Sequence, residues 1–248
     1  MKKKYGLIGY SLGHSLSKMF FNNKFTSEGV DAEYINFELK DIKELKYVLH
    51  ENPELCGLNV TLPYKTDVIP LLDSITDNAR NIGAVNVIKF KKKKFGKLHL
   101  EGHNSDITGF KQSIEPLLNE THKKALILGT GGASKAVFHG LKQLGIESTF
   151  VSRTKEDLSI TYNEISQKII QDYTVIVNAT PLGMYPKTDF CPDIPYNYLT
   201  PNHILYDLIY NPDDTLFMKK GKEFGAVVKN GLEMLLLQAF ISWEIWND

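Results

Sequence analysis

Hydrophobic residues fall into short runs that alternate with amphipathic stretches along almost the whole chain. The short runs are rich in β-branched and aromatic residues and are typical of buried strands, whereas the amphipathic stretches have helical spacing. This alternation predicts βαβ units around parallel sheets, so the expected fold class is α/β. The expected strands are 4–9, 33–38, 57–61, 84–91, 97–101, 125–128, 148–152, 174–178 and 204–207; the expected helices are one from the Ser15/Ser17 caps to about Gly29, then 41–51, 133–144, 162–170, 213–224 and 231–246.

Two features of this pattern divide the chain. Segments 84–91 and 97–101 are expected to pair as an antiparallel hairpin, with the lysines 91 to 94 at a solvated turn. The strand and helix alternation then restarts at Lys124. We therefore expect two sheets, with the seam between them near residues 103–123.

Composition indicates a globular protein whose partner is a small molecule. The 248 residues are 42% hydrophobic and 23% charged, long enough for one large domain or two small ones. Lys and Arg number 29 and so do Asp and Glu, so charge does not favour nucleic acid or an anionic membrane as partner. We expect a small-molecule substrate and a monomer or homodimer.

The cysteines and the N-terminus indicate a reducing compartment. Cys56 and Cys191 cannot make a disulfide framework, and no Cys/His cluster has zinc spacing, so no metal is expected. The apolar run 5–10 after the N-terminal lysines is too short for a signal peptide. The apolar segment 234–246 falls short of the about 20 residues that span a bilayer. We expect a cytoplasmic protein without a membrane partner.

A glycine-rich turn follows the expected strand 125–128 and opens the next helix. Gly129 suits the tight turn, Gly131 lets a pyrophosphate approach the backbone, and the helix N-terminus offers N–H groups and a positive dipole end. Ser134 stands where a third glycine is usual, and such turns also serve plain packing. The loop therefore favours a dinucleotide-binding site. The alternative is a turn that serves only the packing of the helix against the strand.

The end of the next strand, 148–152, bears on which dinucleotide binds. In an NAD-specific fold an acidic residue about 20 positions beyond the first glycine holds the ribose 2′-hydroxyl, whereas arginine accommodates a 2′-phosphate. Arg153 stands here, able to pair with phosphate or stack on adenine, and Thr154 adds a hydroxyl donor. The pattern favours NADP over NAD, although Glu156 and Asp157 oppose a phosphate site.

Three further polar clusters indicate a ligand. Ser15 and Ser17 lie at a helix start, where N-capping explains one hydroxyl but hardly both. Thr61 and Lys65 follow a strand, and ligands of open α/β sheets bind at strand ends. Asp106 opens a helix at the expected seam. Each cluster alone is explained by a cap or turn, but together their groups suit a small polyhydroxylated acid.

In their order along the chain, these motifs resemble the shikimate dehydrogenase family, and the resemblance covers essentially the whole sequence. It rests on segments 6–9, 14–17, 59–65, 83–86, 102–106, 129–133, 152–154, 178–184, 207–210 and 231–235, with Asn22, Phe25 and Gln238. The chain departs from the family pattern at Tyr10-Ser11 and at Lys18, where proline is usual, and at Ser152, where asparagine is usual.

The resemblance implies two α/β domains and an oxidoreductase. Residues 1–102 and 232–248 would form a substrate-binding domain, and 103–231 a Rossmann-like NADP-binding domain with a parallel sheet. The implied reaction is the reversible, NADPH-dependent reduction of 3-dehydroshikimate to shikimate, in the route to chorismate and aromatic amino acids. The substrate-binding positions that the resemblance implies are Ser15, Ser17, Thr61, Lys65, Asn86, Asp106, Tyr210 and Gln238. The cofactor-binding positions that it implies are Gly129, Thr130, Gly131, Gly132, Ala133, Arg153, Thr154, Thr180, Leu208, Gly231 and Asp77.

Lys65 and Asp106 are the expected catalytic residues. Hydride addition to a ketone leaves an alkoxide, so a proton donor must lie near that oxygen, and Lys65 is the candidate. Asp106 is expected to orient and bind the substrate, because a neighbouring carboxylate raises a lysine pKa and does not explain activation as an acid.

Two other functions remain open from the sequence. One is a quinate/shikimate dehydrogenase with relaxed use of NAD and NADP, which Arg153 and Thr154 disfavour. The other is a non-catalytic relative that senses a metabolite, which the presence of both Lys65 and Asp106 disfavours.

Overall fold

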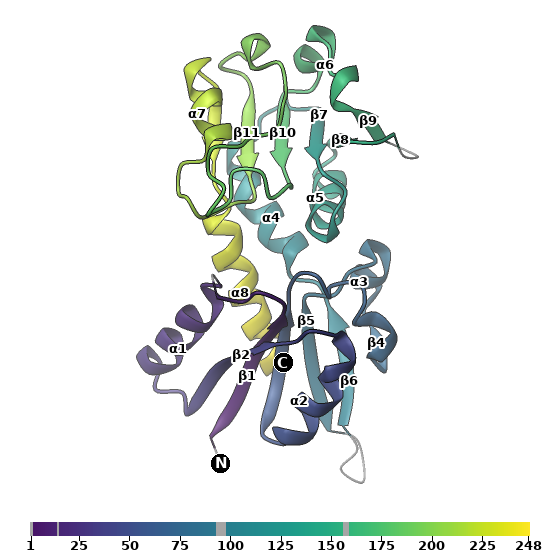
Figure 1. The fold of residues 1–248 in the computed structure, drawn as a ribbon, viewed down its shortest axis with the longest axis vertical. Helices are drawn as coiled ribbons and strands as arrows, with labels where there is room; N and C mark the ends of the chain where they lie inside the picture. The colour runs from purple at the N-terminus through teal and green to yellow at the C-terminus, as the bar shows by residue number, and fades with distance from the viewer. Residues whose placement is uncertain (1, 14, 93–97, 156–158) are drawn as a thin grey trace. The chain divides into compact units, whose positions relative to one another are not determined.

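The chain folds into two compact units, each with its own six-stranded sheet, and the expected α/β class is confirmed (Figure 1). Unit 1 is Met1–Ser105 with Ala239–Asp248, and unit 2 is Asp106–Gln238. The computed structural model describes residues 2–13, 15–92, 98–155 and 159–248. His14, most of the expected lysine-rich turn, Glu156 and Asp157 lie outside the described residues.

Unit 1 contains a mixed sheet in the order β2-β1-β3-β5-β6-β4. Its strands are β1 (Lys3–Gly9), β2 (Ala32–Glu38), β3 (Leu55–Val60), β4 (Ser74–Ile75), β5 (Val87–Lys92) and β6 (Leu98–His103). Strands β2 and β3 run parallel to β1, whereas β5 is antiparallel to both β3 and β6. The carboxyl ends of β1, β3 and β6 therefore lie at the same edge of the sheet as the start of β5.

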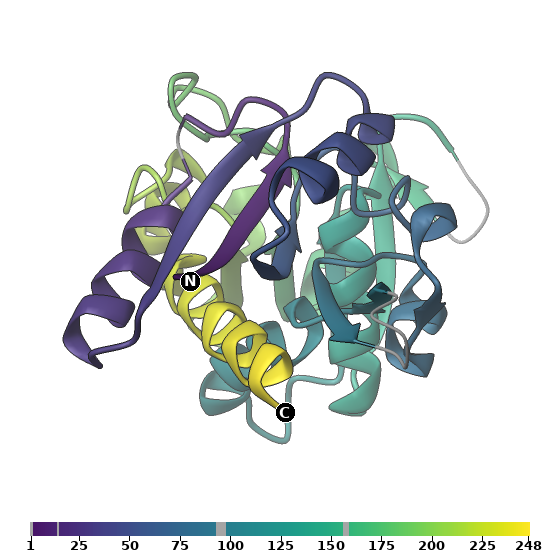
Figure 2. The ribbon, with the colours of Figure 1, turned by 90° about the horizontal axis from the view of Figure 1, so that it is seen from below.

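The side chains of β1 alternate between two apolar clusters, one on each face of the sheet. Tyr5 packs with Phe21 of α1 and with Trp246 near the end of α8, and Figure 2 shows these two helices next to each other. Ile8 packs on the opposite face with Leu45 of α2. The helical segments are α1 (Ser17–Ser27), η1 (Ile42–Glu44), α2 (Leu45–Glu51), η2 (Ile69–Leu71), α3 (Asp77–Ile82) and the last turns of α8 (Leu232–Asn247).

Unit 2 contains a parallel sheet in the order β12-β11-β10-β7-β8-β9. Its strands are β7 (Lys124–Leu128), β8 (Glu147–Ser152), β9 (Ser159–Thr161), β10 (Val175–Asn178), β11 (Ile204–Asp207) and β12 (Val227–Lys229). The chain proceeds from β7 to β8 and β9 on one side, then crosses to β10 on the other. The strand order therefore reverses between β7 and β10, where ligands of open α/β sheets bind.

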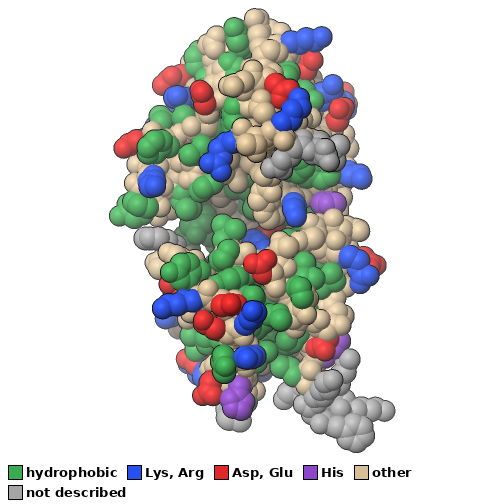
Figure 3. All heavy atoms as spheres, turned by 45° about the vertical axis from the view of Figure 1, so that its right-hand side comes forward, with side chains coloured by type: hydrophobic (Ala, Val, Ile, Leu, Met, Phe, Trp, Pro, Cys, Tyr) green, Lys and Arg blue, Asp and Glu red, His purple; other side chains and the backbone are tan. Residues whose placement is uncertain are grey.

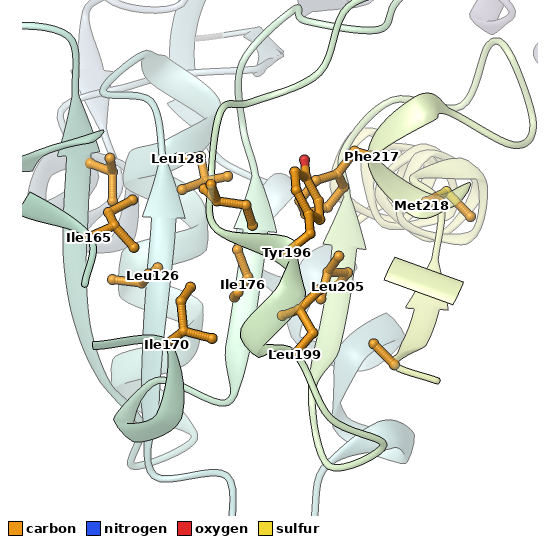
Figure 4. Packing of buried hydrophobic residues seen from close by; sticks show 13 residues of the cluster. Leu126, Leu128, Ile165, Ile170, Ile176, Tyr196, Leu199, Leu205, Phe217 and Met218 are labelled. Atoms are coloured by element: carbon orange, nitrogen blue, oxygen red, sulfur yellow. The ribbon is translucent and has the colours of Figure 1, made fainter. Parts of the chain in front are cut away.

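Helices cover both faces of the parallel sheet, which is why its central strands read as continuous apolar runs. Leu126 and Phe217 belong to the cluster on one face, drawn in Figure 4. Ile127 belongs to the other cluster, with Phe110 of α4 and Met234 of α8. The helical segments are α4 (Asp106–Ile114), η4 (Glu115–Leu117), α5 (Gly132–Gln143), η5 (Tyr162–Glu164), α6 (Gln167–Asp172), η6 (Tyr196–Tyr198), α7 (Leu216–Glu223) and the first turns of α8.

The helix expected over 162–170 is wrong. Thr161 and Glu164 form a capping box around the short η5, so the chain turns there and does not continue as a helix. The helix α6 then begins after Ser166, whose side chain accepts a hydrogen bond from the backbone of Ile169 at 3.4 Å. Two local caps therefore divide a stretch whose spacing suggested one helix.

Other boundaries also differ from the sequence expectations. No serine caps α1: its N-cap is Leu16, and the hydroxyl of Ser15 accepts from the Ser17 N–H at 3.3 Å. The elements β4, α3, β9 and β12 were not expected from the sequence. The compact units divide after Ser105 and Gln238, whereas the expected boundaries follow residues 102 and 231, because Met234 of α8 packs in the core of unit 2.

Side chains of both charges lie interspersed on the face shown in Figure 3, in keeping with the balanced composition. Within the described part of the chain, every helix is too short or too polar to cross a bilayer.

Candidate functional site

The loop after β7 makes a tight glycine turn at the carboxyl edge of the sheet of unit 2. Gly129 has φ +106°, and a Cβ atom there would lie 3.1 Å from Thr180 Cγ2 and 3.2 Å from Ala179 O. Glycine is therefore required both for its conformation and for the close approach of the loop after β10. Two expected cofactor positions, Gly129 and Thr180, are thus neighbours at the point where the strand order reverses.

The helix α5 begins directly after this turn. Its N-cap is Gly131, which contributes no capping side chain, and Thr130 and Gly131 are exposed. A Cβ atom on Gly131 would meet no heavy atom within 4 Å, so there is open space in front of the helix N-terminus. Backbone N–H groups and the positive end of the helix dipole there suit a pyrophosphate.

The segment after β11 is tied to the residues that precede α8. Gly231 donates its N–H to Ile209 O at 3.0 Å, and a Cβ atom on Gly231 would overlap Leu208 O. The N–H of Leu208 in turn bonds Asn178 O at 3.0 Å. The structure therefore brings Leu208 and Gly231 into contact at the same edge as the glycine turn.

A cationic strand end follows β8. Arg153, Thr154 and Lys155 are exposed, and the hydroxyl of Ser152 bonds Thr154 O, which holds the turn. Lys155 Nζ lies 2.8 Å from Glu164 Oε1.

Two charges of this strand end act on neighbouring groups. The ammonium of Lys155 and hydrogen bonds from Thr161 hold the pKa of Glu164 at about 2. Burial raises the pKa of Tyr162, and the nearby charge of Arg153 opposes that rise. Arg153 is exposed, and a guanidinium can pair with a phosphate or stack on an adenine.

Asp207, at the end of β11, is a fully buried carboxylate that connects two loops of this edge. Its Oδ1 accepts from Asn178 Nδ2 and from the Ile209 N–H, both at 3.0 Å, and its Oδ2 accepts from Thr215 Oγ1 at 2.7 Å. Asn178 Oδ1 in turn accepts from Thr180 Oγ1 at 2.7 Å. Burial raises the pKa of Asp207 to about 6 despite these hydrogen bonds.

The edge of the unit 1 sheet at the end of β3 collects a second group of expected site residues. Thr61 follows β3, and a Cβ atom on Gly9 at the end of β1 would lie 2.5 Å from its methyl group. Lys65 O accepts from the Val85 N–H at 2.7 Å, which places the lysine backbone beside Asn86. Ser15 and Ser17 follow β1 at this same edge. The arrangement combines hydroxyls, an amide and an ammonium group.

Within unit 2, α4 and α8 bring two more expected substrate positions close together. A Cβ atom on Gly109 would lie 3.0 Å from Met234 O and 3.1 Å from Gln238 Cβ, so the two helices nearly touch there. Asp106 precedes Gly109 by one helical turn and is 5% exposed. Gln238 therefore lies about one turn from Asp106 on the facing helix.

The profile of the shikimate dehydrogenase substrate binding domain matches residues 7–88. A shikimate dehydrogenase (NADP(+)) of Clostridium beijerinckii is 40% identical over 264 residues, spanning 98% of this chain and 92% of that protein. The crystal structure of shikimate dehydrogenase from Aquifex aeolicus superposes with a TM-score of 0.86 at 36% identity, covering 99% of this chain and 92% of the other.

This chain belongs to the shikimate dehydrogenase family. A quinate dehydrogenase from Corynebacterium glutamicum in complex with NAD has the same fold, with a TM-score of 0.85 at 25% identity over 99% of this chain and 93% of the other. This fold therefore does not by itself determine whether NAD or NADP binds. That preference depends on the residues at the end of β8.

The remaining family positions lie in both units. Tyr210 follows β11 in unit 2, where burial raises its pKa. Asp77 lies in the first turn of α3 in unit 1, whereas the other expected cofactor positions belong to unit 2. Among the described residues no group of three or more His, Cys, Asp or Glu side chains could hold a metal ion.

Asp207 and Tyr34 are two buried residues whose roles were not predicted from the sequence. An acidic residue at the end of a buried strand was the available signal for Asp207. Tyr34, on β2, gave no such signal, because a tyrosine in a strand is ordinary and its partner Asn59 is 25 positions away.

Proposed function

We propose that this shikimate dehydrogenase family member catalyses the reversible, NADPH-dependent reduction of 3-dehydroshikimate to shikimate. The observation that carries the proposal is a nucleotide loop followed by an arginine at the next strand end in unit 2, in a chain whose unit 1 gathers Thr61, Lys65 and Asn86 at one edge. Unit 1 is then the substrate-binding domain and unit 2 the NADP-binding domain.

The residues of unit 2 fit NADP. Gly129, Thr130, Gly131, Gly132 and Ala133 would hold the pyrophosphate against the N-terminus of α5. Arg153 and Thr154 would bind the 2′-phosphate, since both are exposed at the end of β8.

The other cofactor positions would complete the nucleotide site. Thr180, Leu208 and Gly231 lie along the carboxyl edge of the same sheet and would contact the cofactor there, and Asp77 is the further cofactor position that the family resemblance gives. Bound NADPH would supply the hydride.

The substrate would be held by a set of hydroxyls, amides and one carboxylate. A trihydroxylated carboxylic acid needs many hydrogen-bonding partners, and the family positions provide them. Those positions are Ser15, Ser17, Thr61, Asn86, Asp106, Tyr210 and Gln238.

Lys65 would transfer the proton. In the reducing direction its ammonium gives a proton to the substrate oxygen as negative charge develops there, and in the reverse direction the neutral amine removes the proton from the hydroxyl. Asp106 would bind and orient the substrate relative to Lys65. Water must be kept from the reacting atoms during transfer, which is a task of the surrounding protein.

The context of the reaction follows from its chemistry and from the family. Shikimate formed here would enter the route to chorismate and aromatic amino acids, and the enzyme would act in the cytoplasm as a monomer or homodimer.

A spectrophotometric assay of NADP+ reduction at saturating shikimate tests the proposal. The same assay with quinate and with NAD+, in all four combinations, separates the proposed activity from that of a quinate dehydrogenase. We expect the shikimate and NADP+ pair to give the highest kcat/KM. Equal or faster rates with NAD+ or with quinate would favour the quinate/shikimate alternative, and no turnover at all would favour a metabolite sensor.

A further inference from the structure

A chain of buried hydrogen bonds crosses unit 1. Tyr34 Oη donates to Asn59 Oδ1 at 2.8 Å, and Asn59 Nδ2 donates to Ser242 Oγ at 3.0 Å. Ser242 Oγ lies 3.3 Å from Ser105 Oγ, which accepts from Asn86 Nδ2 at 2.9 Å. The residues come from β2, β3, α8, the segment after β6 and the segment before β5, so five distant parts of the sequence meet in one network.

One end of this chain is an expected substrate position. Asn86 forms one end, and its Oδ1 also accepts from the Ser105 N–H at 2.7 Å. At the other end, burial raises the pKa of the Tyr34 phenol, and the Ser17 side chain opposes that rise. Between Asn86 and Tyr34, the side chains of Ser105, Ser242 and Asn59 provide a continuous path.

The network is enclosed by the core, so its geometry is well constrained. Ser105 and Ser242 are 0% exposed, Tyr34 is 1% exposed and Asn59 is 6% exposed. The ring of Tyr34 stacks on Phe21, with centroids 4.6 Å apart and an interplanar angle of 9°. Buried polar groups that are bonded on both sides have few alternative orientations, because breaking any link leaves an unsatisfied group away from water.

We propose that Tyr34, Asn59 and Ser242 are positioning residues that hold Asn86 in the orientation that binds shikimate. The proposal rests on the proposed function, since it assigns Asn86 to the substrate. Ser105 clamps the amide of Asn86 through two hydrogen bonds, and Ser242 supports Ser105 from the C-terminal helix. Tyr34 orients Asn59, whose Nδ2 also donates to Asn86 O at 3.2 Å. A ligand bound by preorganised groups loses less free energy to their ordering, so the network contributes to affinity without touching the ligand.

The isosteric variant Tyr34→Phe tests one end, and Ser242→Ala tests the centre. Each removes a hydroxyl while keeping the surrounding packing. We expect the KM and the Kd for shikimate to rise about three- to tenfold in each variant, the effect expected for losing one hydrogen bond. We expect the Kd for NADP+ to stay within about twofold, because the NADP+ site is assigned to residues outside the network.

Tyr196→Phe is the matched control. Tyr196 is also buried, and its hydroxyl also donates one hydrogen bond at 2.8 Å, to Pro192 O in unit 2. This variant should lower Tm by an amount similar to Tyr34→Phe and leave the Kd for shikimate unchanged. A Tyr34→Phe variant that loses thermal stability but keeps wild-type Kd and KM for shikimate would show a purely structural network and overturn the proposal.

Calorimetric titration with shikimate distinguishes this proposal from the proposed function. A wild-type protein that binds shikimate without turning it over would refute the activity, while the ratio of Kd between Tyr34→Phe and wild type would still decide the positioning role. A wild-type protein that neither binds nor oxidises shikimate would overturn both. If the wild-type protein oxidises shikimate and both variants, Tyr34→Phe and Ser242→Ala, keep the wild-type Kd for shikimate, the positioning role alone is overturned.

Discussion

The indole of Trp246 packs directly on the backbone of Gly57, so closely that a Cβ atom on Gly57 would overlap the ring. Trp246 Nε1 also donates to Ile88 O at 3.1 Å. These two contacts fasten the end of α8 to β3 and β5 of the unit 1 sheet. A strand position without a side chain thus accommodates a tryptophan of the C-terminal helix, and the segment that carries Ser242 is held in place.

Gly57→Ala should therefore destabilise the protein by about 2–3 kcal/mol, although alanine usually favours a strand over glycine. The added methyl group must displace Trp246 or shift β3. Urea unfolding measured on wild type and variant checks this value. Gly13→Ala is the control, since a Cβ atom there would meet nothing within 4 Å, and it should change the free energy of unfolding by less than about 0.5 kcal/mol.

Lys65→Ala should lower kcat by about 10²- to 10⁴-fold with a much smaller change in the KM for shikimate. A proton-transfer group acts mainly in the transition state, so its loss affects turnover more than binding. Steady-state kinetics in both directions measure the effect. The exposed Lys142 of α5 supplies a control variant, Lys142→Ala, which should keep wild-type kinetics. Turnover of Lys65→Ala near the wild-type rate would refute the assignment.

Asp106→Asn should reduce both substrate affinity and turnover, with a larger effect on the KM for shikimate than Lys65→Ala shows. The substitution keeps the shape of the side chain and removes the charge, so it tests the carboxylate itself. Loss of a charge-assisted hydrogen bond corresponds to about a ten- to hundredfold change. Unchanged KM and kcat would mean that the carboxylate at the start of α4 does not contact the substrate.

Arg153→Ala should raise the KM for NADP+ about ten- to hundredfold and leave the KM for NAD+ nearly unchanged. The guanidinium is assigned to the 2′-phosphate that NAD+ lacks, so removing it should bring the KM values for the two cofactors close to parity. Lys155 adds a second positive charge but is paired with Glu164, which favours the lower part of this range. A wild-type enzyme that uses NAD+ as well as NADP+ would show that Arg153 does not select the cofactor.

Asp207→Asn should change how stability depends on pH. Burial raises the Asp207 pKa from 3.8 to about 6, so the folded state binds this proton more readily than the unfolded state does. The stabilisation is complete below about pH 4 and is lost as the pH rises through about 6, a loss of roughly 3 kcal/mol.

The amide introduced by Asp207→Asn cannot titrate, so this loss should be absent from the variant. The free energy of unfolding of wild type relative to Asp207→Asn should therefore fall between pH 4 and pH 7, as measured by urea titrations at one-unit intervals. Asp172→Asn, at the exposed end of α6, should show no such trend relative to wild type. A constant difference between wild type and Asp207→Asn across this range would contradict the prediction.

Local sequence determined the parts of this protein that depend on short-range patterns. The apolar run before Gly129 and the glycine turn after it predict a strand, a sharp turn and a helix within a dozen residues, because steric limits on the backbone act locally. Arg153 follows the next strand directly, so its place at a strand end was also predictable. The motif order along the chain then indicated the family.

Tertiary structure alone decided which distant residues meet. Ser242 lies 183 positions from Asn59 and 137 from Ser105, yet these side chains share one buried network. Helical spacing in 231–246 predicts a helix but not its division between two cores, one built around Met234 and the other around Trp246. Such contacts depend on how complete sheets and helices pack, and the free energy of that packing is shared among residues that no local pattern connects.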